Sequence, residues 1–277
     1  MTNDFISPAK RCAPGKKYSN GSCFTIEQLK SIAKQTNKQH PSININYNHN
    51  NKKELVRTIT KVLKNKYDCD NDLCWLNLDV VKDLNDEEIN NFTFRPPGPD
   101  RGTKWLNTTD INQVLEQYTR IYPDFISFSA VPLDFKTLDH LKMKQNENNL
   151  ENLWNRGIRQ IGIVFNHDYS NMGGSHWVGL YINLSNGNIY YFDSYGTTPK
   201  KEVLDYINII KHFMTSKRVN SNYKYNNIRH QFKGSECGVY SINFILRLLK
   251  GESFKEITTN ITTDDDVNLC RQVYFTP

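Results

Sequence analysis

Long apolar runs are missing from this sequence of 277 residues. No stretch reaches 18 consecutive apolar residues, and a membrane-spanning helix needs about 20, so we expect no membrane span. The opening residues, MTNDFISPAKRC, also lack the apolar core of a secretory signal. We therefore expect a reducing compartment in which the six cysteines are mostly free thiols.

Acidic residues are scarce in the first quarter of the chain. Residues 1–66 hold 13 Lys and Arg against 3 Asp and Glu, whereas residues 67–277 hold 22 against 26. The overall charge of +6 is therefore carried by the N-terminal part. A charge asymmetry of this kind indicates a module that faces an acidic partner, such as nucleic acid or an anionic surface. A solvated basic face on a packing or substrate-docking arm is the alternative reading.

The tight two-residue spacing of zinc knuckles is absent too. Four of the six cysteines, Cys12, Cys23, Cys69 and Cys74, lie in the N-terminal part, with ten and four residues inside the two pairs. Four cysteines in two pairs could bind a zinc ion in tetrahedral geometry. Buried free thiols suit the wide spacing better, and we expect no metal.

The N-terminal part reads as a small helical module. Apolar residues recur at helical spacing over 24–39 and again over 52–66. The Pro- and Gly-rich stretch FRPPGPDRGT places a boundary near 95–103, because it continues neither a helix nor a central strand. We expect a basic helical arm domain, 1–95, and a larger domain, 96–277.

The larger domain changes from helical spacing to strand patterns. β-Branched and aromatic runs predict strands over 158–165, 177–183 and 188–192, and the turn signal Ser185–Asn188 joins the last two as a hairpin. A short strand is also expected within 124–135, before polar helix and loop over 136–157. Strands that neighbour one another, with helices before and after them, predict an α+β fold with a mixed, mainly antiparallel sheet.

Helical spacing in this domain predicts three helices. The first carries Ile111 and Val114 on its apolar face, and Thr109 or Asp110 is its expected cap. The second covers 200–215 with Leu204 among its inward residues, and a polar connection, 216–227, follows it. The third begins at Cys237 and buries one broad face.

Cys237 is the candidate nucleophile. A thiol at a helix N-terminus is favoured as thiolate, the form that attacks carbonyls. His176 opens the strand WVGLYIN, and Asp193 closes the next strand, so an antiparallel pair makes them neighbours. Such a pair supplies a base and its orienting carboxylate. Gln231 precedes the thiol by six residues, where its amide and the Cys237 N–H could form an oxyanion hole. Each residue alone is common as packing or turn; the ordered set is rare by chance.

These four residues, with Trp177 after the histidine and Gly238 after the cysteine, resemble the signature of the Ulp1-type cysteine proteases. Trp105-Leu106-Asn107 resembles the entry to the same catalytic domain, and the likeness covers about 103–250. Within the family, the basic arm and the Gly-Gly-Ser lead into His176 look most like the polyprotein proteases of African swine fever virus and giant viruses.

The resemblance implies a papain-like core with His176 as base, Asp193 as its orienter, Gln231 as oxyanion donor and Cys237 as nucleophile, without a cofactor. It also implies a narrow substrate groove formed by Trp177, Trp105 and Gly174 that admits small residues. The expected activity is cleavage at Gly-Gly-X sites of viral structural polyproteins, in the host cytoplasm and virion. Removal of a ubiquitin-like modifier from host proteins is the alternative. A nucleic-acid-binding scaffold with a vestigial protease core is an alternative of another class.

Overall fold

The computed structural model describes residues 11–99, 104–138 and 147–276. The chain divides into two compact units, which are Met1–Pro96 with Phe275–Pro277, and Pro97–Tyr274. None of the helices in the described ranges is both long and apolar enough to span a bilayer.

The first unit is built on two amphipathic helices, and both confirm the helices that the sequence predicts. Helix α1 (Ile26–Gln39) begins at Thr25, whose side chain accepts from the Gln28 backbone while the Gln28 side chain accepts from the Thr25 backbone. This capping box satisfies N–H groups that the helix itself leaves unpaired. Helix α2 (Lys52–Tyr67) begins at Asn51. Three shorter helices follow: α3 (Asp72–Trp75), α4 (Asp79–Lys82) and α5 (Glu87–Phe92).

Aromatic side chains pack against one another in the core of this unit. The Phe24 ring stacks on Trp75 with ring centroids 5.9 Å apart and meets Phe94 edge-on at 5.1 Å. The buried faces of the two long helices complete the core with Leu29, Ile32, Leu55, Ile59 and Leu63.

The expectation of free thiols is wrong for the four cysteines of this unit. Cys12 pairs with Cys23, and Cys69 pairs with Cys74, with Cα atoms 5.4 and 5.8 Å apart. Folding brings each pair within the range that a disulfide bridges. The sulfur atoms are bonded to each other, so these residues do not supply the thiolates of a zinc site either. Cys237 and Cys270 are free and buried.

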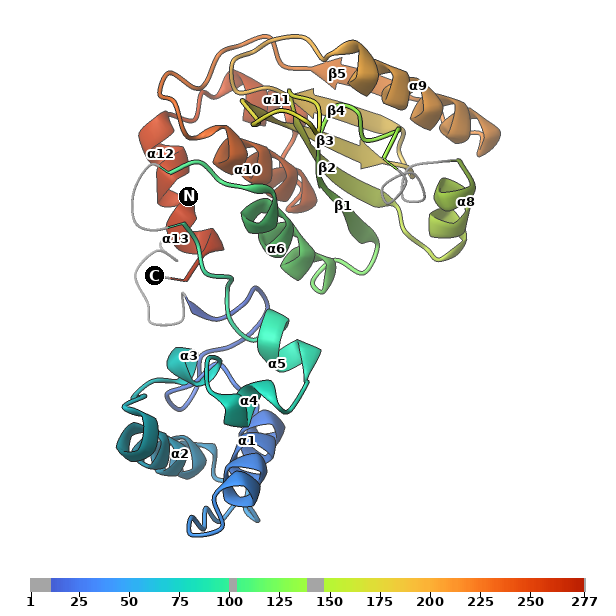
Figure 1. The fold of residues 1–277 in the computed structure, drawn as a ribbon. Helices are drawn as coiled ribbons and strands as arrows, with labels where there is room; N and C mark the ends of the chain where they lie inside the picture. The colour runs from blue at the N-terminus through green and yellow to red at the C-terminus, as the bar shows by residue number, and fades with distance from the viewer. Residues whose placement is uncertain (1–10, 100–103, 139–146, 277) are drawn as a thin grey trace. The chain divides into compact units, whose positions relative to one another are not determined.

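The second unit contains a mixed five-stranded sheet in the order β1-β2-β3-β4-β5 (Figure 1). The strands are β1 (Phe125–Val131), β2 (Gln160–Asn166), β3 (Trp177–Asn183), β4 (Asn188–Phe192) and β5 (Asn222–Tyr225). The central pairs β2–β3 and β3–β4 are antiparallel, and the outer pairs β1–β2 and β4–β5 are parallel. The hairpin between β3 and β4 and the α+β class are as the sequence predicts.

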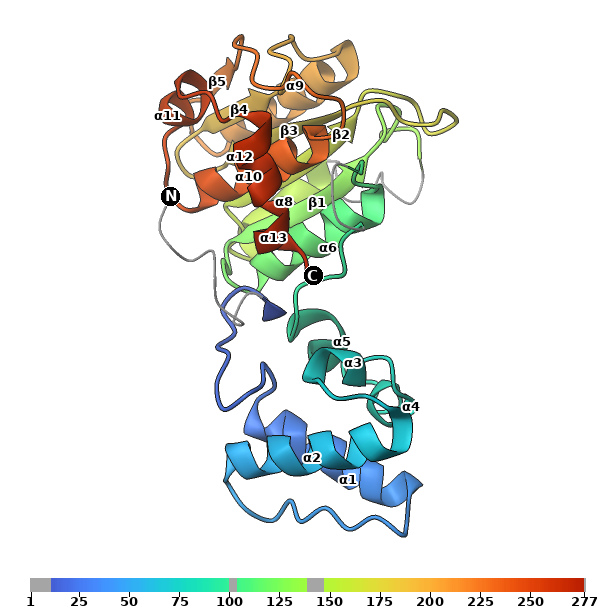
Figure 2. The ribbon, with the colours of Figure 1, turned by 90° about the vertical axis from the view of Figure 1, so that its left-hand side faces the viewer.

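Helices cover both faces of this sheet (Figures 1 and 2). Helices α8 (Glu147–Asn155) and α9 (Lys201–Ser216) share one apolar cluster with the strands. Helices α6 (Thr108–Thr119) and α10 (Cys237–Leu249) lie on the opposite face. There Phe244 of α10 stacks on Phe192 at the end of β4, with centroids 5.1 Å apart. The buried helix α10 thus carries its first residue, Cys237, to the end of the sheet.

Three local predictions need correction. The cap of α6 is Asn107 rather than Thr109 or Asp110, because the Asn107 side chain reaches the Asp110 N–H and completes a capping box. Leu204 faces solvent at 37% exposure, because it stands at the edge of the apolar stripe of α9. The connection 216–227 contains strand β5, which is only four residues long and in which only Tyr223 is partly buried, so its pattern is too short to stand out.

Short helices complete the unit: α11 (Phe254–Thr259), α12 (Asp264–Leu269) and α13 (Arg271–Tyr274). Within the stretch expected as polar helix and loop, 136–157, helix α8 is present and residues 139–146 lie outside the described residues.

Candidate active site

Cys237 is the first residue of α10 and is 2% exposed. The helix N-terminus places positive partial charge at its side chain. Gly238 lets a neighbouring segment approach this point, because a Cβ there would lie 3.0 Å from the Leu106 Cβ. The Trp105–Asn107 segment therefore passes directly beside the start of α10.

His176 and Asp193 meet at the end of the β3–β4 hairpin. The β3–β4 register ends at the pair Gly179–Phe192, so Asp193 comes directly after the ladder and His176 three residues before it, at the same end of the hairpin. The His176 Nε2–H donates to Asp193 Oδ1 at 2.7 Å, and both side chains are buried. The Cys237 side chain is near enough to the ring to contribute, after Asp193, to the raised pKa of His176. Because Asp193 takes Nε2, Nδ1 is the nitrogen left for the thiol.

The electrostatics of the pair follow from these contacts. Burial by itself lowers the pKa of His176, but hydrogen bonds to Asp193 and Cys237 and their negative charge outweigh it and raise the pKa to about 9. Burial likewise raises the pKa of Asp193, but its bonds with His176, Thr197 and the Tyr195 backbone lower it overall. The site therefore holds an imidazolium beside a carboxylate at neutral pH.

The turn after β4 builds the rest of the site. Tyr195 stacks on the His176 ring with centroids 4.4 Å apart and planes 9° from parallel. On another side, His167 meets the His176 ring edge-on at 5.0 Å. Burial, followed by the nearby His176 charge, lowers the pKa of His167 to about 4. His167 is therefore neutral at pH 7, and its low pKa makes it a weaker base than His176.

Gln231 is fully buried and is held by both ends of its amide. Its Oε1 accepts from Ser194 Oγ at 2.6 Å, and its Nε2 donates to the Lys233 carbonyl at 2.9 Å. The Gln231 backbone N–H also donates to the Ser194 carbonyl. An amide nitrogen carries two protons, and the Lys233 carbonyl accepts one of them. Gln231 is thus fixed in orientation by the same turn that carries Asp193.

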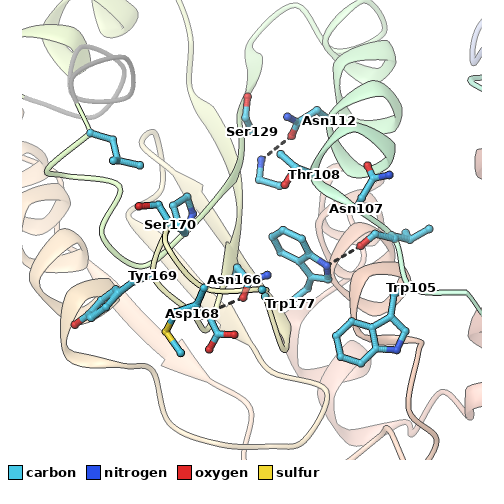
Figure 3. A pocket seen from close by; sticks show the side chains of 17 residues that line it. Trp105, Asn107, Thr108, Asn112, Ser129, Asn166, Asp168, Tyr169, Ser170 and Trp177 are labelled. Atoms are coloured by element: carbon cyan, nitrogen blue, oxygen red, sulfur yellow. Dashed lines mark hydrogen bonds between the residues drawn. The ribbon is translucent and has the colours of Figure 1, made fainter.

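Trp105, Trp177 and Gly174, the expected substrate residues, line one pocket of about 720 Å³ (Figure 3). The Trp177 Nε1–H donates to the Leu106 carbonyl at 2.8 Å, so Trp177 is fixed and 7% exposed, whereas Trp105 is 50% exposed. Gly174 has a φ of 80°, and a Cβ there would lie 2.8 Å from Asn166 Nδ2. Asp168, Tyr169 and Met172 line the pocket from the loop opposite Trp105.

Three positioning residues were not predicted from the sequence. Asn226 holds the Asp193 backbone, Ser194 holds the Gln231 amide, and Tyr195 covers the His176 ring. Ser194 and Tyr195 directly follow Asp193, so their place beside a candidate catalytic carboxylate was a usable signal. Asn226 lies in an Asn-rich connection, where nothing in the sequence distinguishes it from its neighbours.

Known proteins share this chain's sequence and fold. The profile for the catalytic domain of the Ulp1 protease family matches residues 129–276. Thiol protease R355 of Acanthamoeba polyphaga mimivirus is 36% identical over 283 residues, which cover 95% of this chain and 92% of the relative. The SUMO-1 cysteine protease of African swine fever virus is 26% identical over 249 residues, covering 80% and 89% respectively.

A crystal structure extends the likeness to the fold. A protease of African swine fever virus superposes with a TM-score of 0.67 and 21% identity, over 98% of this chain and 97% of that one. Fold, profile and relatives agree with the resemblance seen at Cys237 and His176. The chain therefore belongs to the Ulp1 protease family and is a cysteine peptidase with viral relatives.

Proposed function

We propose that this peptidase is an endopeptidase that cuts after small residues at Gly-Gly-X sites, with Cys237 as nucleophile. The observation that carries the proposal is that His176 bonds to Asp193 and lies near Cys237, which helps to raise its pKa, one residue from a wall of the Trp105–Trp177 pocket. We infer that the substrate chain passes between these two indoles, in a slot that suits glycine because no side chain has to fit.

The reaction follows from the placement of the groups. The Cys237 thiolate adds to the scissile carbonyl carbon, and the negative charge moves to the carbonyl oxygen. The backbone N–H of Cys237 and the remaining Gln231 N–H stabilise that oxygen. The His176 imidazolium donates its proton to the leaving nitrogen, the C–N bond breaks, and a thioester remains. Neutral His176 then deprotonates a water, which hydrolyses the thioester and restores the thiol.

Peptide cleavage tests this proposal. Fluorogenic peptides that end in Gly-Gly before the reporter should be cleaved by the wild type and not by Cys237→Ser. Peptides with valine in place of the second glycine should be cleaved at least about tenfold more slowly, since the slot has to exclude a branched side chain. Equal cleavage by wild type and Cys237→Ser, or of both peptides, would refute the proposal.

The natural substrate that we propose is a viral structural polyprotein, processed in the host cytoplasm and virion. Removal of a ubiquitin-like modifier is the second candidate, and the name of the SUMO-1 cysteine protease of African swine fever virus favours it. The two candidate functions differ in which reagents should label the enzyme. A SUMO or ubiquitin with a C-terminal electrophile should label Cys237 only if modifiers are substrates. Labelling without cleavage of polyprotein peptides would favour the second candidate. The intact catalytic set argues against a vestigial core.

The basic arm supports a proposal about a partner. Lys53, Arg57, Lys61 and Lys64 are exposed and follow one another at helical spacing on α2. They form one basic stripe (these four residues) that extends about 16 Å along the helix axis. No ion pair is formed by these four within the described residues. We propose that the stripe binds the phosphate backbone of nucleic acid.

A further inference from the structure

A second exposed feature flanks His176, apart from the pocket of Trp105 and Trp177. Phe232 is 69% exposed, and the Arg229 guanidinium lies 4.9 Å from its ring centroid and 5.1 Å from that of Tyr195. Arg229 is thus shared between two aromatic rings at the surface, and Ile228 beside it is also exposed. We call these four residues, Tyr195, Ile228, Arg229 and Phe232, the ledge.

The ledge is a built surface rather than a chance grouping of side chains. His230 and Gln231 donate their backbone N–H groups to the Ser194 carbonyl at 2.8 and 2.9 Å. Gly196 has a φ of 73°, and a Cβ there would come within 2.8 Å of the Ile228 carbonyl carbon. The Arg229 Nε–H donates to the Gln231 carbonyl at 2.6 Å. The turn after β4 and the 228–232 segment are therefore fastened together, which fixes the spacing of the rings.

The ledge is continuous with the catalytic groups. Tyr195 stacks on the His176 ring, and Gln231 lies in the chain between Arg229 and Phe232. None of the four ledge residues lines the pocket that holds Trp105 and Gly174. The site thus has two flanks: the pocket on one, and the ledge on the other.

The chemistry of amide cleavage decides which part of a substrate each flank meets. In the proposed function the Trp105–Trp177 slot takes the residues on the acyl side of the scissile bond. His176 has to reach the leaving nitrogen to protonate it. The chain that departs with that nitrogen therefore passes the imidazole and Tyr195, which stacks on it. From there it meets Arg229 and Phe232.

We propose that the ledge binds the substrate segment downstream of the scissile bond and selects a large apolar side chain within its first three residues. The inference rests on the proposed function. Exposed apolar surface of this kind marks interaction sites in soluble proteins. The two rings and Ile228 would cover the apolar side chain, and the guanidinium N–H groups would donate to backbone carbonyls of the departing segment.

Capture of the acyl-enzyme by added amines tests this proposal. A peptide thioester ending in Gly-Gly acylates Cys237 and releases its thiol, and an added amine then attacks the enzyme thioester. The amine nitrogen gains the acyl group and loses a proton to His176, and the Cys237 sulfur leaves. The probes are triglycine amide and its versions with one phenylalanine at position 1, 2 or 3. The ratio of amide product to hydrolysed acid measures binding at the ledge.

At least one phenylalanine probe should capture the wild-type acyl-enzyme about tenfold better than triglycine amide. Phe232→Ser and Arg229→Ala should reduce that preference to less than about twofold, and Arg229→Lys, which keeps the charge but loses the planar stack, should reduce it as well. Leu204→Ser, at another exposed apolar residue, is the matched control and should keep the preference. Circular dichroism would confirm that each variant is folded.

The outcomes separate the two proposals. A burst of released thiol followed by equal capture of all probes by the wild type would overturn the ledge alone. So would a preference that survives in Phe232→Ser, or one for a glutamate-containing probe over phenylalanine. The lack of any thiol burst would overturn the proposed function, and the ledge with it.

Discussion

Asn226 holds both backbone groups of the candidate catalytic Asp193. Its Oδ1 accepts from the Asp193 N–H and its Nδ2 donates to the Asp193 carbonyl, each at 2.8 Å. Nδ2 also donates to the Ile228 carbonyl at 3.0 Å. One buried amide thus ties the carboxylate that orients His176 to the segment that leads to Gln231.

Asn226→Ala should lower kcat by about tenfold to a hundredfold with little change in KM, because a small displacement of Asp193 misaligns the imidazole. It should also reduce stability, since a buried backbone group without its partner costs about 1–3 kcal/mol. Steady-state kinetics and thermal melts check both effects. Asn227→Ala, at an exposed neighbour, is the control; equal losses in the two variants would contradict a positioning role.

Asp193→Asn should lower the pKa of His176, since it removes the charge that opposes the effect of burial. The raised pKa stabilises the fold fully below pH 6.5, and this stability is lost as pH rises through about 9. The wild type should thus lose on the order of 3 kcal/mol over this window, and the variant much less. We also expect a 10²- to 10⁴-fold loss of kcat/KM. Denaturant melts between pH 6 and 10 measure the first effect; identical profiles would refute it.

The lowered pKa of His167 predicts the opposite dependence of folding stability on pH, which appears at acidic pH. Its pKa is about 4 in the folded chain, so the unfolded chain binds a proton first as pH falls below 6.5. This should destabilise the wild type by about 2 kcal/mol at pH 5 relative to pH 7. His167→Gln should remove that part of the acid sensitivity, whereas His212→Gln, at an exposed histidine of α9, should not. Melts at both pH values compare them, and a variant as acid-sensitive as the wild type would contradict the prediction.

The two disulfides predict the number of reactive thiols. The unfolded, unreduced protein should show two thiols by Ellman titration, Cys237 and Cys270, and six after reduction. Cys237→Ser should lower both numbers by one. Six thiols before reduction would instead agree with the reducing compartment expected from the sequence.

Neutralising the basic stripe should weaken nucleic-acid binding and flatten its salt dependence. Replacing Lys53, Arg57, Lys61 and Lys64 with Gln should reduce the slope of log affinity against log salt by up to about 3.6 for duplex DNA. Fluorescence anisotropy with a labelled duplex measures this. The control neutralises exposed lysines of the other unit, Lys200, Lys224, Lys250 and Lys255. Equal slopes in the two variants would locate binding elsewhere.

Local patterns carry a large part of this fold. The apolar spacing of α1, α2 and α10 predicts each helix, because a buried face repeats every 3.6 residues. The turn at Ser185–Asn188 predicts the β3–β4 hairpin, and the alternation of paired strands then places His176 beside Asp193. Strand β5 is not predicted, because an alternation of only four residues, Asn222 to Tyr225, with one partly buried side chain is too short to mark a strand.

The sequence by itself determined the family and predicted four candidate residues, His176, Asp193, Gln231 and Cys237, because a motif and a hairpin turn are short-range features. Only the tertiary structure decided what holds them, which is the hydrogen bond from Ser194 to Gln231 and the hydrogen bond between Asn226 and Asp193; in the other unit it also decided the pairing of Cys12 with Cys23. These contacts join residues 11 to 37 positions apart that have no common periodicity. They exist because the sheet and the buried helices bring separate turns together, and no local propensity encodes that meeting.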